Sequence, residues 1–183
     1  VFDGTAEVHT EDELISPLGV YGQTKAAGDV LVGQLPQHYL VRTSWVIGDG
    51  RNFVRTMAEL AGRGVKPSVV ADQFGRLTFA STLAAGIVHL LSSGAAYGTY
   101  NLTNDGPTRS WAELAAQVFA AVGRDASDIT AVTTAEYSAG KELSPRPQHS
   151  TLSLDKIKAT GFEIPDADAE LTAYVARLLS ESS

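Results

Sequence analysis

The feature that most constrains the fold is a regular alternation of strand-like and helix-like segments. Residues 38–46 (HYLVRTSWV) are rich in β-branched and aromatic residues and predict a buried strand; helical patterns precede it at 21–35 and follow it at 52–61. Strands that are separated by helices usually pair in parallel, because the helix returns the chain to the same end of the sheet. The sequence therefore predicts an α/β fold with largely parallel strands.

The alternation continues through the rest of the chain. Ser110-Trp111-Ala112-Glu113 is the best-defined helix start, because it forms a capping box in which the serine and glutamate side chains satisfy free amides of the first turn. We expect Ser81 or Thr82 to cap another helix, Val-Phe-Asp-Gly at 1–4 to end a strand, and the segment up to about residue 150 to be irregular after its last strand. The further predicted strands are at 67–72, 98–103 and 129–134, and the further predicted helices are at 81–91, 111–122, 154–160 and 168–179.

Composition narrows the class of protein. The chain of 183 residues is long enough for one domain with a sizeable core. The net charge of −7 and the scattered basic residues argue against a nucleic-acid partner, and no apolar run approaches the ~20 residues that span a membrane. With no cysteine there is no disulfide or thiolate metal site, and the four histidines lie far apart, so no structural transition metal is expected. No signal peptide is visible, and we expect a cytoplasmic protein.

Two tyrosine and lysine pairs have the spacing that places both side chains on one face of a helix: Tyr21 with Lys25, and Tyr137 with Lys141. Such a pair is chemically useful, because a neighbouring cation favours the phenolate and a phenol beside a hydride donor acts as a general acid. Gly140 lies within the second pair and argues against a helix there. A surface helix with an exposed lysine remains the alternative for the first pair.

Several motifs occur in the order found in one family of sugar-nucleotide enzymes. They are VFDG at 1–4, PLGVYGQTKAAGD at 17–29, VRTSWVIGDGRNFVRTM at 41–57, DQFGRLTFA at 72–80, GTYNLTNDGPTRSWAELA at 98–115 and RPQHSTLSLDKIKATGF at 146–162. Together they resemble the dTDP-4-dehydrorhamnose reductases, which are extended short-chain dehydrogenases/reductases. The resemblance covers nearly the whole chain, and several motifs are specific to these reductases.

The resemblance implies a doubly wound, Rossmann-type nucleotide-binding fold with a small substrate-binding region. The implied reaction reduces the C4 keto group of dTDP-4-dehydro-L-rhamnose to dTDP-L-rhamnose with NADPH or NADH. By similarity, Tyr21 protonates the C4 alkoxide, Lys25 binds the nicotinamide ribose, and Thr43 and Ser44 line the nicotinamide.

The resemblance also implies a set of substrate-binding residues: Trp45, Asn52, Phe53, Arg76 and Arg146. Core packing is the alternative for Trp45, and a surface position is the alternative for both arginines. We expect Trp111 to be a core anchor. Mg²⁺ dependence cannot be judged from this sequence.

The chain also departs from the family pattern. No Gly-rich phosphate loop occurs in it, and neither does the family's catalytic Ser or Thr, which lies just before the segment that matches 1–4. We therefore expect 1–183 to form a single α/β unit, a C-terminal fragment that lacks the first βαβ units and is inactive alone. Its exposed sheet edge favours a homo-oligomer or association with another chain. Leu77, where proline is usual, and 166–168, where tryptophan often occurs, are smaller departures.

Two alternatives to the reductase remain open. One is a non-catalytic reductase-like subunit that binds or regulates, and the other is a sugar-nucleotide epimerase of the same superfamily. Retention of both Tyr21 and Lys25 counts against the non-catalytic subunit.

Overall fold

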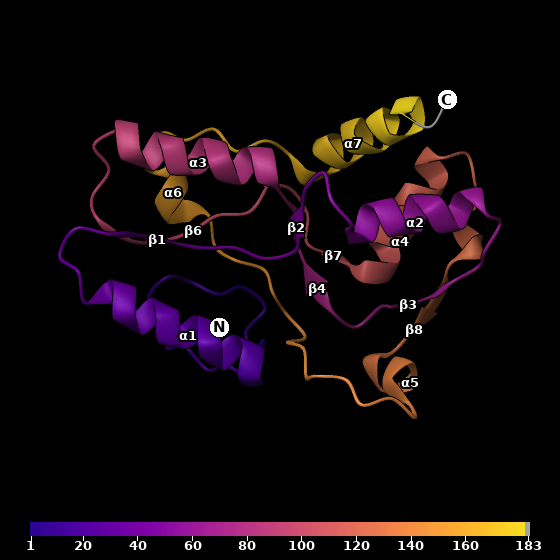
Figure 1. Cartoon of the computed structure of the whole chain (residues 1–183), viewed down its shortest axis with the longest axis horizontal. Coiled ribbons are helices and arrows are strands. Elements are labelled where there is room, and N and C mark those ends of the chain that lie inside the picture. Colours follow the sequence, from indigo (N-terminus) through magenta and orange to yellow (C-terminus); the bar gives the residue numbers. More distant parts are fainter. Residues whose placement is uncertain (182–183) are drawn as a thin grey trace.

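The computed structural model describes residues 1–181, and its elements alternate as the sequence predicts (Figure 1). The helices are α1 (Val20–Gly33), α2 (Phe53–Gly62), α3 (Ala80–Ser92), α4 (Trp111–Ala121), α5 (Thr134–Ser138), α6 (Asp155–Lys158) and α7 (Ala167–Glu181), with a short 3₁₀ turn at Ala126–Asp128. The strands are β1 (Tyr39–Arg42), β2 (Val46–Ile47), β3 (Ser68–Val70), β4 (Phe74–Gly75), β5 (Thr78–Phe79), β6 (Gly98–Asn101), β7 (Arg109–Ser110) and β8 (Thr130–Val132).

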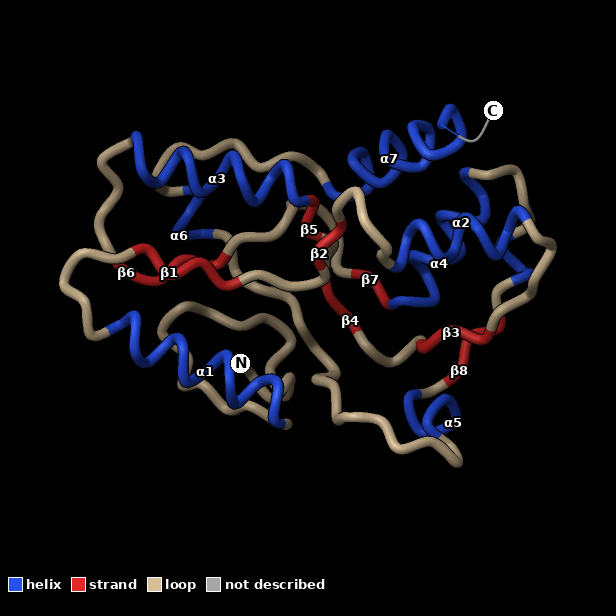
Figure 2. Tube along the Cα trace, in the orientation of Figure 1, coloured by secondary structure: helices blue, strands red, loops and turns tan. Residues whose placement is uncertain are grey.

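The strands are short and pair two by two (Figure 2), and most of the pairs are parallel. β1 pairs in parallel with β6, β2 with β5, and β3 with β8, whereas β4 and β7 are antiparallel. The prediction of an α/β fold with largely parallel strands is confirmed. Within residues 1–181, no helix is long and apolar enough to span a membrane.

The apolar core has two parts. The larger part lies around α4, where Val118 and Phe119 are fully buried against side chains of α2, α7 and the nearby strands. The smaller part joins α3, α6 and β6 through Leu90, Ile157 and Tyr100. Helix α1 lies beside β1 on the side away from α3, as Figure 1 shows.

The predicted strand at 38–46 is interrupted, which corrects the sequence prediction. β1 ends at Arg42, and β2 starts at Val46 and pairs with β5 instead of continuing alongside β6. The cause is a turn at Trp45, whose φ of 47° lies in the left-handed region. A bulky residue is rare in that conformation, so residue composition alone indicates a continuous strand.

Three smaller predictions are also wrong. Residues 1–4 form no strand, although Phe2 is buried and stacks on His9. Helix α3 begins after Phe79 and has no side-chain cap, so neither Ser81 nor Thr82 caps it. The segment predicted to be irregular contains α5, which begins with a second capping box between Thr133 and Glu136.

Candidate functional site

Tyr21 and Lys25 lie on an open face of α1, in its first two turns. Both side chains are exposed, and the Lys25 ammonium lies 5.6 Å from the centre of the Tyr21 ring. Lys25 makes no ion pair with any carboxylate of residues 1–181. The pair is therefore available to a ligand.

The second pair has a different backbone. α5 ends at Ser138 and Gly140 has a φ of 72°, so Lys141 is not on the helix, as its sequence predicts. The chain nevertheless turns back and places the Lys141 ammonium 4.1 Å from the centre of the Tyr137 ring. Both pairs thus have the same sequence spacing and an ammonium close to a phenol ring, but only Tyr21 and Lys25 lie on one helix.

Thr43 and Ser44 lie directly beyond the carboxyl end of β1, where ligands bind in parallel α/β sheets. The Thr43 hydroxyl donates to the buried Thr78 hydroxyl at 3.1 Å, and Thr78 donates to the Ser44 carbonyl at 2.5 Å. The Ser44 hydroxyl is buried without a hydrogen-bond partner among residues 1–181, and Ser44 lines a small cavity of about 100 Å³ together with Phe2 and His149. This is the kind of group that a bound ligand satisfies.

A larger hollow of about 730 Å³, which we call the aromatic groove, lies between α2, α4, α5 and the segment at 142–146. Phe53 and Trp111 give it an apolar side, and Tyr137 and Arg146 contribute on the side of α5. Phe53 and Trp111 contact each other with ring centres 4.5 Å apart. Trp45 does not line the groove; its indole stacks on Trp111 with centres 3.7 Å apart.

The position of α5 is fixed by the residues that follow β3. Asp72 accepts hydrogen bonds from the amide and the hydroxyl of Thr134 at 2.8 and 2.6 Å, and Gln73 donates to the same hydroxyl at 3.0 Å. Partial burial disfavours the Asp72 carboxylate, but the hydrogen bonds from Thr134 outweigh it and lower the pKa of Asp72. Asp72 therefore holds α5, one side of the groove, in place as an anion.

The two candidate arginines differ in accessibility. Arg146 is exposed at the groove and makes no ion pair with the described carboxylates. Arg76 is mostly buried, donates to the Leu152 carbonyl at 2.9 Å and lies 3.7 Å from Asp105. Burial lowers the pKa of Arg76, and Asp105 opposes that effect. A diphosphate role for Arg76 stays a prediction, and its contacts favour a structural role.

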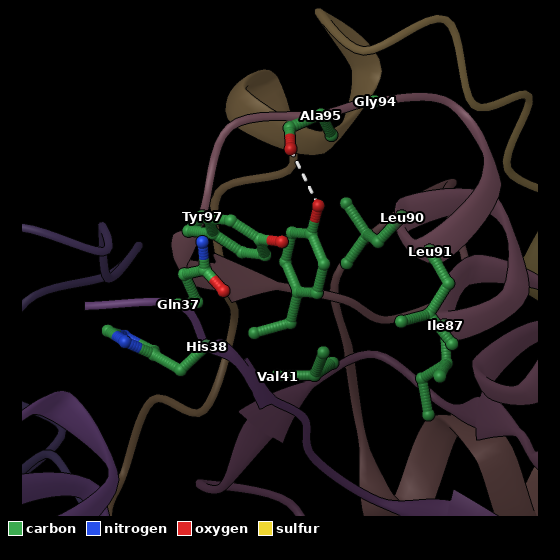
Figure 3. Close-up of a pocket in the computed structure, with 10 residues that line it drawn as sticks. Gln37, His38, Val41, Ile87, Leu90, Leu91, Gly94, Ala95 and Tyr97 are labelled. Carbon is green, nitrogen blue, oxygen red and sulfur yellow. Dashed lines mark hydrogen bonds between the residues drawn. The ribbon is translucent and has the colours of Figure 1, made fainter. Parts of the chain in front are cut away.

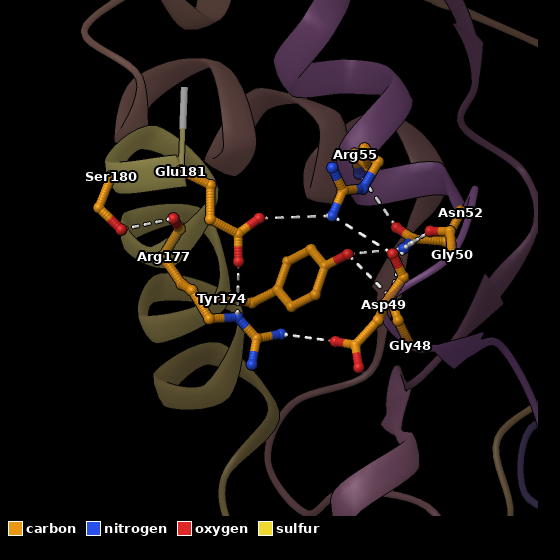
Figure 4. A network of polar contacts seen from close by, with 9 residues as sticks. All are labelled: Gly48, Asp49, Gly50, Asn52, Arg55, Tyr174, Arg177, Ser180 and Glu181. Atoms are coloured by element: carbon orange, nitrogen blue, oxygen red, sulfur yellow. Dashed lines mark hydrogen bonds and ion pairs between the residues drawn. The ribbon is translucent and has the colours of Figure 1, made fainter. Parts of the chain in front are cut away.

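The Asn52 side chain is engaged in holding the loop before α2 (Figure 4). Its oxygen accepts from the Arg55 amide at 3.0 Å and caps α2, while its amide nitrogen lies 2.7 Å from the Tyr174 hydroxyl and 2.8 Å from the Gly48 carbonyl. Tyr174 also donates to the Gly48 carbonyl at 2.8 Å. Asn52 thus ties α7 to the loop, and its predicted substrate contact has no support in this geometry.

Segments that are distant in the sequence meet between α1 and the groove. Gly19, which precedes α1, is so close to Pro145 that an added Cβ would lie 3.5 Å from the proline ring. Gly4 has a φ of 79° and packs against Pro147, where a Cβ would lie 2.6 Å away. Gly19, which immediately precedes α1, is therefore next to Pro145 at one edge of the groove.

A second hollow of about 730 Å³ lies at the opposite end of β1 (Figure 3). It is lined by Ile87, Leu90 and Leu91 of α3 and by residues of 37–41 and 94–97, and the Tyr39 hydroxyl donates to the Ala95 carbonyl at 2.6 Å. Because it lies at the amino end of β1, it is a weaker ligand-site candidate than the aromatic groove. Among residues 1–181, no cluster of three or more side chains could hold a metal ion.

Comparisons with known proteins show what this chain is similar to. A dTDP-4-dehydrorhamnose reductase of Aggregatibacter actinomycetemcomitans is 36% identical over 92% of this chain and 60% of its own length. A probable dTDP-4,6-dihydroxy-2-methyloxan-3-one 4-ketoreductase of Streptomyces antibioticus is 35% identical over 88% of this chain and 55% of its own. The crystal structure of a Bacillus anthracis dTDP-4-dehydrorhamnose reductase in complex with NADP has a TM-score of 0.85 and 32% identity, over 96% of this chain and 61% of that one.

These similarities define the fold as the α/β fold of the short-chain dehydrogenases/reductases. Within that class, the chain belongs to the RmlD substrate binding domain family, which matches residues 1–180. The chain spans less than two thirds of the length of the relatives that it matches.

Sequence reasoning missed the role of two residues in shaping the groove. Trp111 packs against the core as the sequence predicts, but it is only half-buried and also lines the groove. Tyr137, for which the sequence indicates no role, also lines the groove. The sequence signal for Trp111 is its place as the first residue of a capped helix. Side chains on a helix tilt toward its amino end, so a side chain at this position is accessible to a ligand there.

Proposed function

We propose that this chain is the C-terminal part of a reductase that converts dTDP-4-dehydro-L-rhamnose to dTDP-L-rhamnose with NADPH or NADH. The observation that supports it most is the exposed Tyr21–Lys25 pair on α1, the helix whose preceding residue, Gly19, lies next to Pro145 at one edge of the aromatic groove. The names of the relatives support the same reaction class.

The residues present fit a nicotinamide cofactor in part. Tyr21 and Lys25 are exposed, Thr43 is exposed beyond β1, and the Ser44 hydroxyl lacks a partner among the described residues. The Gly-rich loop that cradles a pyrophosphate is not in the sequence. We therefore propose that this chain supplies the nicotinamide and ribose side of the cofactor site, and that the pyrophosphate side comes from residues outside it.

When bound, the nicotinamide supplies the hydride for the keto carbon. Tyr21 donates the phenolic proton to the oxygen that becomes an alkoxide. The Lys25 ammonium stabilises the phenolate that Tyr21 then carries, and it would hold the ribose of the cofactor. Thr43 and Ser44, which follow β1, would hold the nicotinamide.

The aromatic groove takes the nucleotide part of the substrate. Phe53 and Trp111 provide an apolar surface for the planar base, and Arg146 provides a guanidinium that suits diphosphate oxygens. Gln73 and Glu142 add polar groups for the edge of the base. The chain's own residues thus account for binding the substrate more fully than for binding the cofactor.

The identity of the sugar is the open alternative within this class. The relative from Streptomyces antibioticus is named for a different dTDP-bound ketone. Assays with dTDP-4-dehydrorhamnose and with other dTDP-4-keto-6-deoxy sugars, compared by kcat/KM, distinguish the two readings.

The test of the mechanism is Tyr21→Phe in the whole protein, with Tyr97→Phe as the matched control. Removal of a general acid lowers kcat by about 10²- to 10⁴-fold. The control should keep the wild-type kcat, because Tyr97 is also exposed but lies at the amino end of β1, outside the aromatic groove. Equal losses in both variants, or full activity of Tyr21→Phe, would contradict the proposal.

We also propose that the isolated chain self-associates. β1 pairs only with β6 among residues 1–181, so its other edge is free to pair, and α1 exposes Val20 and Leu31 nearby. Light scattering checks this expectation. A monomer at high concentration would contradict it.

A further inference from the structure

The chain has two tryptophans, and they stack on each other. The indole centres of Trp45 and Trp111 lie 3.7 Å apart with an interplanar angle of 19°. Trp111 lines the aromatic groove, whereas Trp45 follows Thr43 and Ser44 in the turn after β1. The stack therefore joins the groove to the turn that carries the residues assigned to the nicotinamide.

The turn at Trp45 is a strained element. Its φ of 47° is the one positive value at a non-glycine residue within the described chain. A bulky residue keeps this conformation only where its surroundings hold it there. The contacts of the indole and of the adjacent carbonyls thus decide where Thr43 and Ser44 lie.

Contacts from two sides hold the turn. The buried Thr78 donates from its amide to the Trp45 carbonyl at 3.1 Å and from its hydroxyl to the Ser44 carbonyl. Gly75 lies against the indole, and a Cβ there would be 2.9 to 3.1 Å from three ring carbons. The indole is thus packed against both Gly75 and Trp111, with no room for a side chain at 75.

Trp111 is itself firmly placed. It is the first residue of α4, whose capping box joins Ser110 and Glu113. β4 and β7 pair so that Gly75 lies opposite Arg109, two residues before Trp111. Gly75 and Trp111, which both contact the Trp45 indole, are therefore connected through the pairing of β4 with β7.

We propose that Trp111 is a positioning residue that couples occupation of the aromatic groove to the Thr43–Ser44 turn through Trp45. The inference rests on the proposed function, because the ligand in the groove is the thymidine diphosphate part of a nucleotide sugar. A base that rests against Trp111 restrains that ring, and the stack passes the restraint to Trp45 and the turn. In this way substrate binding orders the residues beside the nicotinamide.

The test uses circular dichroism of the 183-residue chain, since stacked indoles give a bisignate exciton band. Trp45→Phe and Trp111→Phe should each abolish the band, because each leaves a single indole. Thymidine diphosphate should change the amplitude of the wild-type band in step with the heat measured by calorimetry. A band that survives in either variant would show that the two indoles are not coupled and overturn the inference.

Gly75→Ala tests the coupling without altering either tryptophan. The new methyl displaces the rigid indole of Trp45, so the band should weaken and thymidine diphosphate should bind about five- to tenfold less tightly. Gly62→Ala is the matched control, since nothing lies within 4 Å of that position, and it should leave the band and the affinity unchanged.

Trp111→Phe should keep most of the affinity for thymidine diphosphate, and Trp111→Ala should lose about tenfold. Thermal melts verify that each variant is folded.

Two negative results have different meanings. If thymidine diphosphate binds but the band stays constant, or if Gly75→Ala binds it as tightly as the wild type, the coupling is wrong and the proposed function stands. If calorimetry detects no binding of thymidine diphosphate to the wild-type chain, the proposed function is wrong and the coupling falls with it.

Discussion

Helices α4 and α1 both lie beside parallel strands, but their surroundings differ. α4 buries Ala112, Leu114, Ala115, Val118 and Phe119 among α2, α7 and the strands. α1 buries only Ala26, and it exposes Val20 by 76% and Leu31 by 72%. The element that carries the proposed proton donor is thus loosely held, while the element that starts with a groove residue is at the centre of the core. Stability and proton transfer are assigned to different parts of the chain.

The largest expected effect compares an apolar truncation in each helix. Phe119→Ala removes a fully buried ring from α4 and should lower the free energy of unfolding by about 3–5 kcal/mol. Leu31→Ala on α1 should change it by less than about 0.5 kcal/mol, because that side chain is mostly exposed. Urea denaturation of both variants measures the two values. Similar losses would show that α1 is packed as closely as α4.

Two glycines extend the comparison to α3. A Cβ at Gly86 would lie 2.4 Å from a methyl of Leu102, so Gly86→Ala should destabilise the chain by about 1–3 kcal/mol. Nothing lies within 4 Å of a Cβ at Gly28 in α1, so Gly28→Ala should stabilise it by about 0.5–1 kcal/mol through helix propensity. Thermal melts should give shifts of opposite sign. Melting temperatures that shift in the same direction in both variants would contradict the difference in packing between α3 and α1.

The smallest expected effect concerns acid. Arg109 donates to both carboxylate oxygens of Asp168, at 3.0 and 2.5 Å. This ion pair connects β7 to the first turn of α7. These hydrogen bonds lower the pKa of Asp168 from its ordinary value of 3.8. A carboxyl whose pKa is lower in the folded state contributes stability above its ordinary pKa and loses it as the pH falls through the lower folded value.

Asp168→Asn should therefore lower stability at neutral pH by at most about 1 kcal/mol, since the pair is partly exposed, and by less as the pH falls below 4. Denaturation curves at several pH values measure the difference between wild type and variant. A difference that grows toward acid would have the wrong sign for this account.

The parts of the fold that follow local rules could be predicted from the sequence. The capping box at Ser110 and Glu113 forms as expected, and α1 spans almost the predicted residues. The interruption at Trp45 could not be predicted, because it depends on Gly75, Thr78 and Trp111 from three other places in the chain. Short-range signals identify elements, and tertiary contacts decide where they break.

The candidate site shows the same limit. The helical position of Tyr21 and Lys25 could be deduced from neighbouring residues, and the structure agrees. Arg76 and Arg146 looked equivalent as cations, and only burial distinguishes them: one guanidinium is enclosed by protein groups and the other is exposed at the groove. A sequence gives the charge of a residue and does not give its partners.

The most direct test of the account is calorimetric titration of the 183-residue chain with thymidine diphosphate and, separately, with NADPH. We propose that this chain contains the groove for the substrate and only part of the cofactor site. We therefore expect saturable binding of thymidine diphosphate that weakens in Arg146→Ala, and no micromolar binding of NADPH. Micromolar binding of NADPH, or no binding of thymidine diphosphate, would contradict this division of the site.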